Sequence, residues 1–160
     1  MARIYVSIGS NIEPLRYIRA SLFDIEQHYG TLMLSSIYES KAIGFRGDNF
    51  YNLIAAFDTD MDVHTVAHTL RTIEKNNGRQ RTDNRFSART LDLDILLYDD
   101  LILKDNEIEV PREEILKYAF VLLPLSEIAP TLKHPVIGQS YAELWQTFDK
   151  KDQSLWRVNL

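Results

Sequence analysis

Apolar residues follow two periods along this chain, one typical of strands and one typical of amphipathic helices. Residues 3–8 alternate between apolar and polar, which predicts a first strand followed by a Gly9-Ser10-Asn11 turn. After Pro14, apolar residues recur every three or four positions up to Gly30. This spacing predicts a helix with one buried face formed by Leu15, Ile18, Leu22, Ile25 and Tyr29.

The same two periods predict the remaining elements of a β-α-β-β-α-β order. Strands are expected over 31–38 and 50–57, separated by a loop over 39–49. Asp62 is the expected N-cap of a second helix that ends at Gly78. A last strand is expected over 91–98, with one apolar face to bury: Leu91, Leu93, Ile95 and Leu97.

The C-terminal third is expected to add smaller elements to this order. These are a hairpin over 101–110, a helix beginning at Pro111, an apolar core segment over 120–125 and a covering tail. With 160 residues and no internal repeat, the chain is expected to form a single domain over 1–160. The fold class that this order indicates is α+β: a ferredoxin-like sandwich of a mainly antiparallel sheet, helices packed on one face and C-terminal additions.

Residues 79–94 combine basic and acidic side chains in a pattern that indicates chemistry. Four arginines, at positions 79, 81, 85 and 89, lie in a polar segment that leads directly into the strand carrying Asp92 and Asp94. Side chains two positions apart on a strand point to the same face, so the two Cα atoms are expected about 6.5 Å apart. This carboxylate pair suits Mg²⁺, and neighbouring arginines suit phosphate oxygens.

Charge and composition narrow the function classes. The net charge of −5 argues against a general nucleic-acid binder, although residues 71–90 hold six basic and two acidic side chains, a local footprint for an anion. The absence of cysteine excludes a disulfide framework, thiolate catalysis and cysteine-ligated zinc. No signal-peptide pattern and no apolar run of membrane-spanning length occurs, so a cytoplasmic protein without a membrane partner is expected.

Other interpretations stay open on the residues alone. One alternative is that Asp92 and Asp94 simply form ion pairs with Arg89 and Arg85, although exposed pairs of this kind contribute only about 0 to 1 kcal/mol to stability. A ferredoxin-like RNA-binding module is a second class, but the chain lacks an RNP1 run with interleaved aromatic residues. His64 and His68 lie one turn apart, yet without the H-E-x-x-H pattern we expect surface residues rather than metal ligands.

The run Arg89-Thr90-Leu91-Asp92-Leu93-Asp94-Ile95-Leu96-Leu97, preceded by Arg85-Phe86-Ser87-Ala88, resembles the signature of the 6-hydroxymethyl-7,8-dihydropterin pyrophosphokinases of folate biosynthesis. The resemblance extends over nearly the whole chain. The supporting segments are Ile8-Gly9-Ser10-Asn11, Tyr38 to Gly44, Tyr51-Asn52, Glu74 with Gly78-Arg79, Val110-Pro111, and Phe120 with Leu123-Pro124-Leu125.

This resemblance implies transfer of pyrophosphate from ATP to the pterin hydroxymethyl group, giving AMP and the pterin diphosphate. It also implies two Mg²⁺ ions on Asp92 and Asp94, with Arg79 and Arg89 contacting the transferring phosphates. The implied ATP contacts are Arg71, Glu74, Arg81, Arg89 and Ile95. The implied pterin contacts are Ser40, Lys41, Ile43, Phe50, Asn52, Phe86, Asp92 and Phe120, with the ring between Phe50 and Phe120. The expected partners are these two small molecules, with no nucleic acid, and the expected state is a monomer.

The chain departs from the family pattern in two segments. Phe86 replaces the usual tryptophan, and Ser87-Ala88 replaces glycine-proline, which keeps an aromatic side chain there. After Val110-Pro111 the usual histidine, tyrosine and later basic residue are replaced by Arg112, Glu113 and Tyr118. Arg112 is the expected substitute cation for ATP. A relative that binds nucleotide or pterin without turnover is the alternative that these changes leave open.

Overall fold

The sheet at the centre of the molecule contains six strands among the residues that the structure describes. The computed structural model describes residues 1–42, 47–78 and 90–159. Its strands are β1 (Ala2–Ser10), β2 (Met33–Leu34), β3 (Ile37–Ser40), β4 (Phe50–Thr59), β5 (Asp92–Tyr98) and β8 (Leu155–Val158). They run in the order β5-β1-β4-β3-β8, β2 pairs with β4, and every pairing among the described strands is antiparallel. The expected ferredoxin-like order is confirmed, because β5, β1, β4 and β3 are its fourth, first, third and second strands.

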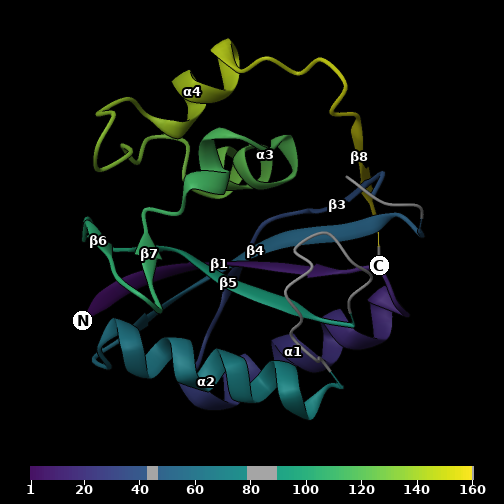
Figure 1. Ribbon diagram of the computed structural model, residues 1–160, viewed down its shortest axis with the longest axis vertical. Helices are drawn as coiled ribbons and strands as arrows, with labels where there is room; N and C mark the ends of the chain where they lie inside the picture. The colour runs from purple at the N-terminus through teal and green to yellow at the C-terminus, as the bar shows by residue number, and fades with distance from the viewer. Residues whose placement is uncertain (43–46, 79–89, 160) are drawn as a thin grey trace.

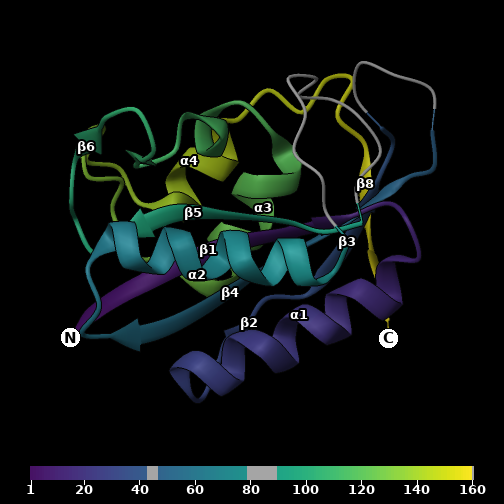
Figure 2. The ribbon, with the colours of Figure 1, turned by 60° about the horizontal axis from the view of Figure 1, so that its bottom comes forward.

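Helices cover both faces of this sheet, which corrects the expectation of one covered face. Helices α1 (Pro14–Tyr29) and α2 (Val63–Asn76) lie side by side on one face, and α3 (Ala119–Ile128) and α4 (Tyr141–Thr147) lie on the other (Figures 1 and 2). The second pair belongs to the C-terminal additions. These additions also include the hairpin of β6 (Leu103–Lys104) and β7 (Glu109–Val110) and the short helix η1 (Glu113–Leu116). Among the described residues, none of the helices is long and apolar enough to cross a membrane.

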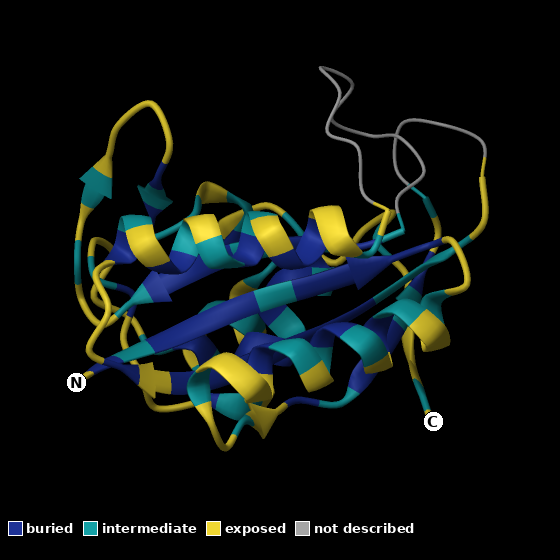
Figure 3. Cartoon of the chain, turned by 90° about the horizontal axis from the view of Figure 1, so that it is seen from below, coloured by how far each residue is buried: buried dark blue, intermediate teal, exposed yellow. Residues whose placement is uncertain are grey.

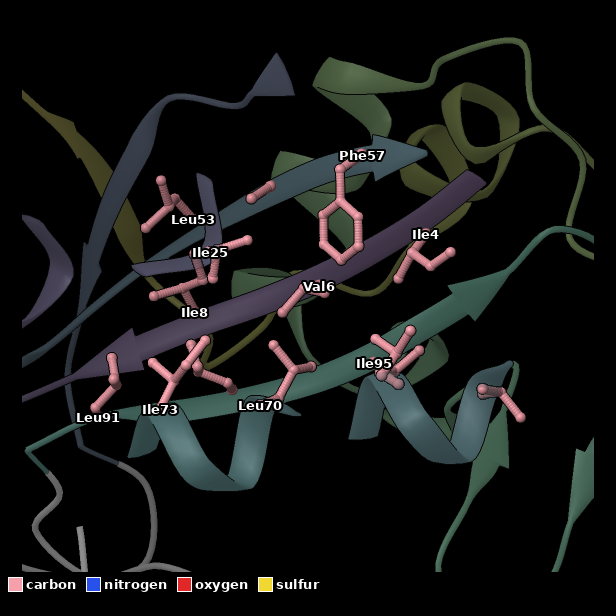
Figure 4. Packing of buried hydrophobic residues seen from close by; sticks show 14 of the residues in the cluster. Ile4, Val6, Ile8, Ile25, Leu53, Phe57, Leu70, Ile73, Leu91 and Ile95 are labelled. Carbon is pink, nitrogen blue, oxygen red and sulfur yellow. The ribbon is translucent and has the colours of Figure 1, made fainter. Parts of the chain in front are cut away.

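Two apolar cores follow from this arrangement. The first lies between the sheet and helices α1 and α2, where the predicted apolar face of β1 packs against the buried stripes of both helices (Figure 4). Leu15, which was expected on the buried face of α1, is exposed instead, in the first turn of that helix. Figure 3 shows the exposed residues of the two helices on their outer surfaces. The second core lies between the sheet and helices α3 and α4, and it includes the fully buried side chain of Tyr141.

The last predicted strand changes face part of the way along its length. Tyr5 lies opposite Leu97 and Val6 opposite Ile95, so β5 carries one extra residue, Leu96, at a β-bulge. Leu91, Leu93 and Ile95 therefore pack in the first core as expected, but Leu97 packs in the second core. The expectation that Leu97 shares their face was wrong, because strict alternation holds only while neighbouring strands stay in register.

Most element boundaries match the predicted start and stop residues. Gly30 ends α1 with φ 83°, and the Asp62 carboxylate caps α2 by accepting the Thr65 N–H at 2.8 Å. Three expectations were wrong: β1 continues through Ser10, the segment 31–38 contributes to two short strands, and η1 replaces a helix starting at Pro111. The expected covering tail supplies an additional strand, β8, at the edge of the sheet beside β3.

Candidate active site

Three neighbouring strands place an amide and a carboxylate in one row. Asn52 on β4 lies opposite Gly9 on β1, and Gly9 lies opposite Asp92 on β5. Directly paired residues point to the same face of a sheet, here the face covered by α3. Because Gly9 has no side chain, the Asn52 amide can lie close over Gly9, which separates it from Asp92 in the sheet.

Gly9 is a site residue that the turn prediction missed. A Cβ at Gly9 would come within 2.7 Å of the Asn52 Oδ1 atom, too close for any residue with a side chain to be accommodated without displacing the amide. The available signal was a glycine at the end of an alternating strand pattern, which often marks close approach of another group.

Asp92 and Asp94 lie on β5, which is an edge strand of the sheet, and both residues are partly buried. Two arginines flank Asp94: Arg71 of α2, with Nη2 3.6 Å from Oδ1, and Arg112, with Nη2 3.6 Å from Oδ2. Burial and the Asp92 charge raise the pKa of Asp94 to about 6, while both arginines lower it. This competition among charges is what a site for a divalent cation would relieve.

Arg71 and Glu74 of α2 form hydrogen bonds with the backbone of Leu93 on the edge of β5 that no described strand pairs with. The Leu93 N–H donates to Glu74 Oε2 at 2.6 Å, and the Leu93 carbonyl accepts a hydrogen bond from Arg71 Nη2. The two side chains also pair with each other, with Nη1 3.1 Å from Oε1. Burial raises the pKa of the Glu74 carboxyl to about 8, and Arg71 opposes that rise. Their observed contacts therefore hold the acidic strand against α2.

Arg112 faces the same carboxylate from the opposite side. Its Nη2 lies 2.7 Å from Glu114 Oε1, and its backbone N–H donates to the carbonyl of Leu96 at the bulge at 3.0 Å. Burial lowers the pKa of Arg112, but Asp94 and Glu114 raise it by more. The pKa therefore lies above its ordinary value, and the guanidinium stays charged. Within the described residues its Nε is buried and has no hydrogen-bond partner. A donor in this position has capacity for an acceptor beyond those that the described residues supply.

A cavity of about 410 Å³ opens between α2, β5 and the β6–β7 hairpin. It brings together the predicted residues Arg71, Asp94, Ile95 and Arg112. The sequence did not indicate the other lining residues: Ala67, His68, Glu107, Ile108, Glu109 and Val110. These residues line the cavity because the β6–β7 hairpin lies against α2. Two contacts join the hairpin to the helix: His64 Nε2 lies 2.8 Å from Asp105 Oδ2, and His68 Nε2 lies 3.3 Å from Glu107 Oε2. Both histidines are therefore surface residues, as expected.

A second cavity, of about 470 Å³, brings the predicted residues Ser40, Lys41 and Phe120 together. Phe120 stacks on Tyr118, with ring centroids 5.1 Å apart. Phe50 lies opposite Ser40 in the sheet, and Asn52 is buried two residues further on, but neither belongs to the described lining of this cavity. Five predicted site residues lie outside the described part of the chain: Ile43, Arg79, Arg81, Phe86 and Arg89.

The donor set fits Mg²⁺ better than a cation that requires a full protein cage. In residues 1–42, 47–78 and 90–159, no group of three or more His, Asp or Glu side chains comes together as a metal site. Mg²⁺ commonly takes one or two carboxylates and completes its shell with water and substrate phosphates. Asp92 and Asp94 supply that number of carboxylates.

Comparison with known proteins gives a consistent family assignment. Residues 5–130 match the family described as 7,8-dihydro-6-hydroxymethylpterin-pyrophosphokinase (HPPK). The proteins named 2-amino-4-hydroxy-6-hydroxymethyldihydropteridine pyrophosphokinase include one from Pseudomonas aeruginosa, 39% identical over 83% of this chain and 84% of that protein. The Haemophilus influenzae protein of the same name is 34% identical over 99% of each chain.

Some relatives are much longer. The Folic acid synthesis protein FOL1 of Dictyostelium discoideum is 35% identical over 84% of this chain, but this chain covers only 20% of that protein. The solved structure of wild-type Plasmodium falciparum HPPK-DHPS has the same fold, with a TM-score of 0.71 and 14% identity over 99% of this chain and 48% of that one. The family matches residues 5–130, and the Pseudomonas aeruginosa and Haemophilus influenzae proteins are matched over most of their length. This chain therefore belongs to the 7,8-dihydro-6-hydroxymethylpterin-pyrophosphokinase family.

Proposed function

We propose that this chain performs the reaction of its family with Mg²⁺ held by Asp92 and Asp94. As a pyrophosphokinase of folate biosynthesis, it transfers pyrophosphate to hydroxymethyldihydropterin, with ATP as the co-substrate. The transfer goes to the hydroxymethyl group and leaves AMP and the pterin diphosphate. The observation that carries the proposal is the row Asn52, Gly9 and Asp92, in which a glycine is the residue between a buried amide and a carboxylate in the sheet.

The metal proposal rests on charge. Two carboxylates two residues apart on one strand repel each other, and both Asp92 and burial raise the pKa of Asp94. Mg²⁺ bound there would neutralise phosphate charge and orient the phosphates for in-line attack. Asp92 and Asp94 would hold two such ions, while Arg71 and Arg112 would keep Asp94 in place from both sides.

ATP is proposed to occupy the 410 Å³ cavity beside the metal site. Arg71, Ile95 and Arg112 line this cavity together with Asp94, so one cavity joins one carboxylate of the proposed metal pair to two guanidinium groups. The Arg112 guanidinium, which belongs to a residue lining this cavity, would donate to a phosphate oxygen. Glu74 contributes by fixing Arg71 and β5, and Arg79, Arg81 and Arg89, outside the described residues, are proposed to contact the phosphates.

The pterin is proposed to bind on the α3 side of the sheet. Its flat ring would stack between Phe50 and Phe120, and the Asn52 amide would pair with its polar edge, since an amide both donates and accepts. Ser40 and Lys41 belong to the same region, because they line a cavity together with Phe120. Asp92 would reach the hydroxymethyl end, and Ile43 and Phe86 are proposed as further contacts.

A product assay tests this proposal. Incubation with ATP, Mg²⁺ and 6-hydroxymethyl-7,8-dihydropterin should yield AMP and the pterin diphosphate in equal amounts, and EDTA should stop the reaction. Formation of ADP, or no turnover with Mg²⁺ present, would contradict the proposed reaction. Full activity in EDTA would contradict the metal assignment alone. A single-domain monomer in the cytoplasm is also proposed, and light scattering tests the monomer.

A further inference from the structure

The C-terminal segment from Asp152 to Leu155 lies between two elements that carry proposed pterin contacts. The 470 Å³ cavity is bounded by Ser40 and Lys41 after β3, by Ala119 and Phe120 at the start of α3, and by residues 152–155. In Figure 1 this part of the chain descends from the α4 side toward β3 and ends in β8. The segment therefore contacts the region of the proposed pterin site from its outer side.

One end of the segment is attached to β3. Leu155 lies opposite Ser40 in the antiparallel pairing of β8 with β3. The next residue strengthens this attachment, because Trp156 Nε1 donates to Glu39 Oε1 at 3.1 Å while Glu39 Oε2 accepts from Asn49 Nδ2 at 3.0 Å. The position of the segment relative to Ser40 is thus set by both backbone and side-chain hydrogen bonds.

The other end is attached to α3 through one side chain. Gln153 Oε1 accepts the Ala119 N–H at 2.8 Å, and Gln153 Nε2 donates to the Lys117 carbonyl at 3.1 Å. The first N–H groups of a helix have no partner within the helix, and the N-cap residue Tyr118 provides no side-chain cap. Gln153 therefore caps α3 from a distant part of the chain. The residue whose N–H it accepts, Ala119, directly precedes Phe120.

The turn that precedes Gln153 is also defined. Asp152 adopts a left-handed backbone with φ 63°, and the Gln153 N–H donates to the Lys150 carbonyl at 3.2 Å. Aspartate tolerates this backbone region better than most residues do. The turn directs the Gln153 side chain toward α3 rather than into solvent, and Gln153 is accordingly half-buried.

We propose that Gln153 is a positioning residue for pterin binding. It fixes the start of α3, and with it Phe120, at a set distance from Ser40 and Lys41 on β3. The role rests on the proposed function, since it acts through the proposed stacking residue. Gln153 touches neither Asp94 nor Arg112, so its effect is confined to the pterin half of the site.

The test compares pterin and ATP binding in two variants. Gln153→Met keeps the length of the side chain but removes both hydrogen bonds. It should weaken pterin binding about three- to tenfold, in line with the loss of one or two neutral hydrogen bonds, and leave ATP binding within about twofold. Gln153→Glu keeps an acceptor for the Ala119 N–H and places a negative charge at a helix N-terminus, so it should recover much of the pterin affinity.

Calorimetry measures both affinities without turnover, using the pterin with a non-hydrolysable ATP analogue and Mg²⁺. The control is Gln146→Ala, an exposed glutamine on α4, which should match wild type. Equal weakening of both ligands, or a Gln153→Met variant that binds pterin as wild type does, would overturn the positioning role. A wild-type protein that binds both ligands but forms no AMP would contradict the proposed reaction and leave this test intact.

Discussion

Gly9 and Asn52 lie opposite each other in neighbouring strands, and a Cβ on Gly9 would come within 2.7 Å of the Asn52 Oδ1 atom. Asn52 is 5% exposed, so its amide has little room to move away. The side chain proposed to pair with the pterin is therefore held in place by the absence of a side chain on the adjacent strand. This relationship leads to the first prediction.

Gly9→Ala should lower pterin affinity because the added methyl group displaces the Asn52 amide. We expect a loss of about tenfold or more, corresponding to a misplaced buried hydrogen-bonding group, measured by calorimetry with the pterin. A double-mutant cycle provides the control. In an Asn52→Ala background the clash partner is absent, so Gly9→Ala should have a much smaller effect; additive effects would refute the proposed contact.

Asp94→Ala should abolish AMP formation while leaving the protein folded. Loss of a metal-holding carboxylate removes several kcal/mol of charge stabilisation, which corresponds to a decrease in rate of about 100-fold or more. The circular dichroism spectrum should match wild type, because Asp94 is only partly buried. Asp100→Ala, an exposed aspartate just beyond β5, serves as the matched control and should keep full activity. An active Asp94→Ala variant would exclude the metal assignment.

Glu74→Ala should destabilise the protein more than Glu74→Gln does. Alanine leaves the buried Leu93 N–H without the acceptor that it now has at 2.6 Å, at a cost of about 1–3 kcal/mol in the free energy of unfolding. Glutamine keeps an acceptor oxygen at that place. Urea unfolding measures the difference, with Lys75→Ala on the exposed side of α2 as the control. Equal destabilisation by both Glu74 variants would show that Leu93 does not depend on this acceptor.

The pair His64–Asp105 should make the stability of the hairpin region pH-dependent. The hydrogen bond to Asp105 raises the pKa of His64, and the Asp105 pKa is lowered by the N–H groups of Glu107 and Ile108 and then by His64. A raised histidine pKa adds stability below the unfolded value of about 6.5, and that stability is lost as the pH rises through the folded pKa. A lowered aspartate pKa adds stability that is lost only in acid.

Thermal unfolding at two pH values tests this. His64→Gln should lower Tm relative to wild type at pH 5.5 and have a smaller effect at pH 8.5, because the stability that depends on the histidine charge falls as the pH rises. Gln27→Ala, at an exposed and non-titrating residue of α1, provides the control. A difference between His64→Gln and wild type that is larger at pH 8.5 would have the wrong sign for this pair.

Local patterns predicted the helices α1 and α2 almost to the residue, because proline, an aspartate cap and terminal glycines act over a few positions. They also placed Asp92 and Asp94 on one face of a strand. Alternation failed at Leu97, where a bulge at Leu96 shifts the register against β1. A bulge is a property of two paired strands, so the pattern of one strand alone does not reveal it.

The amino-acid sequence by itself determined which chemistry the chain carries: the acidic strand, the arginines before it, the aromatic residues and the Asn52 amide. Only the tertiary structure decided how these groups meet. Gly9 approaches Asn52 across a strand pair, Arg71 and Glu74 reach the edge of β5 from a helix, and Gln153 caps a helix 34 residues earlier. Periodicity reports which face of an element is buried. Contacts between distant segments depend on packing, register and loop paths, which no local pattern encodes.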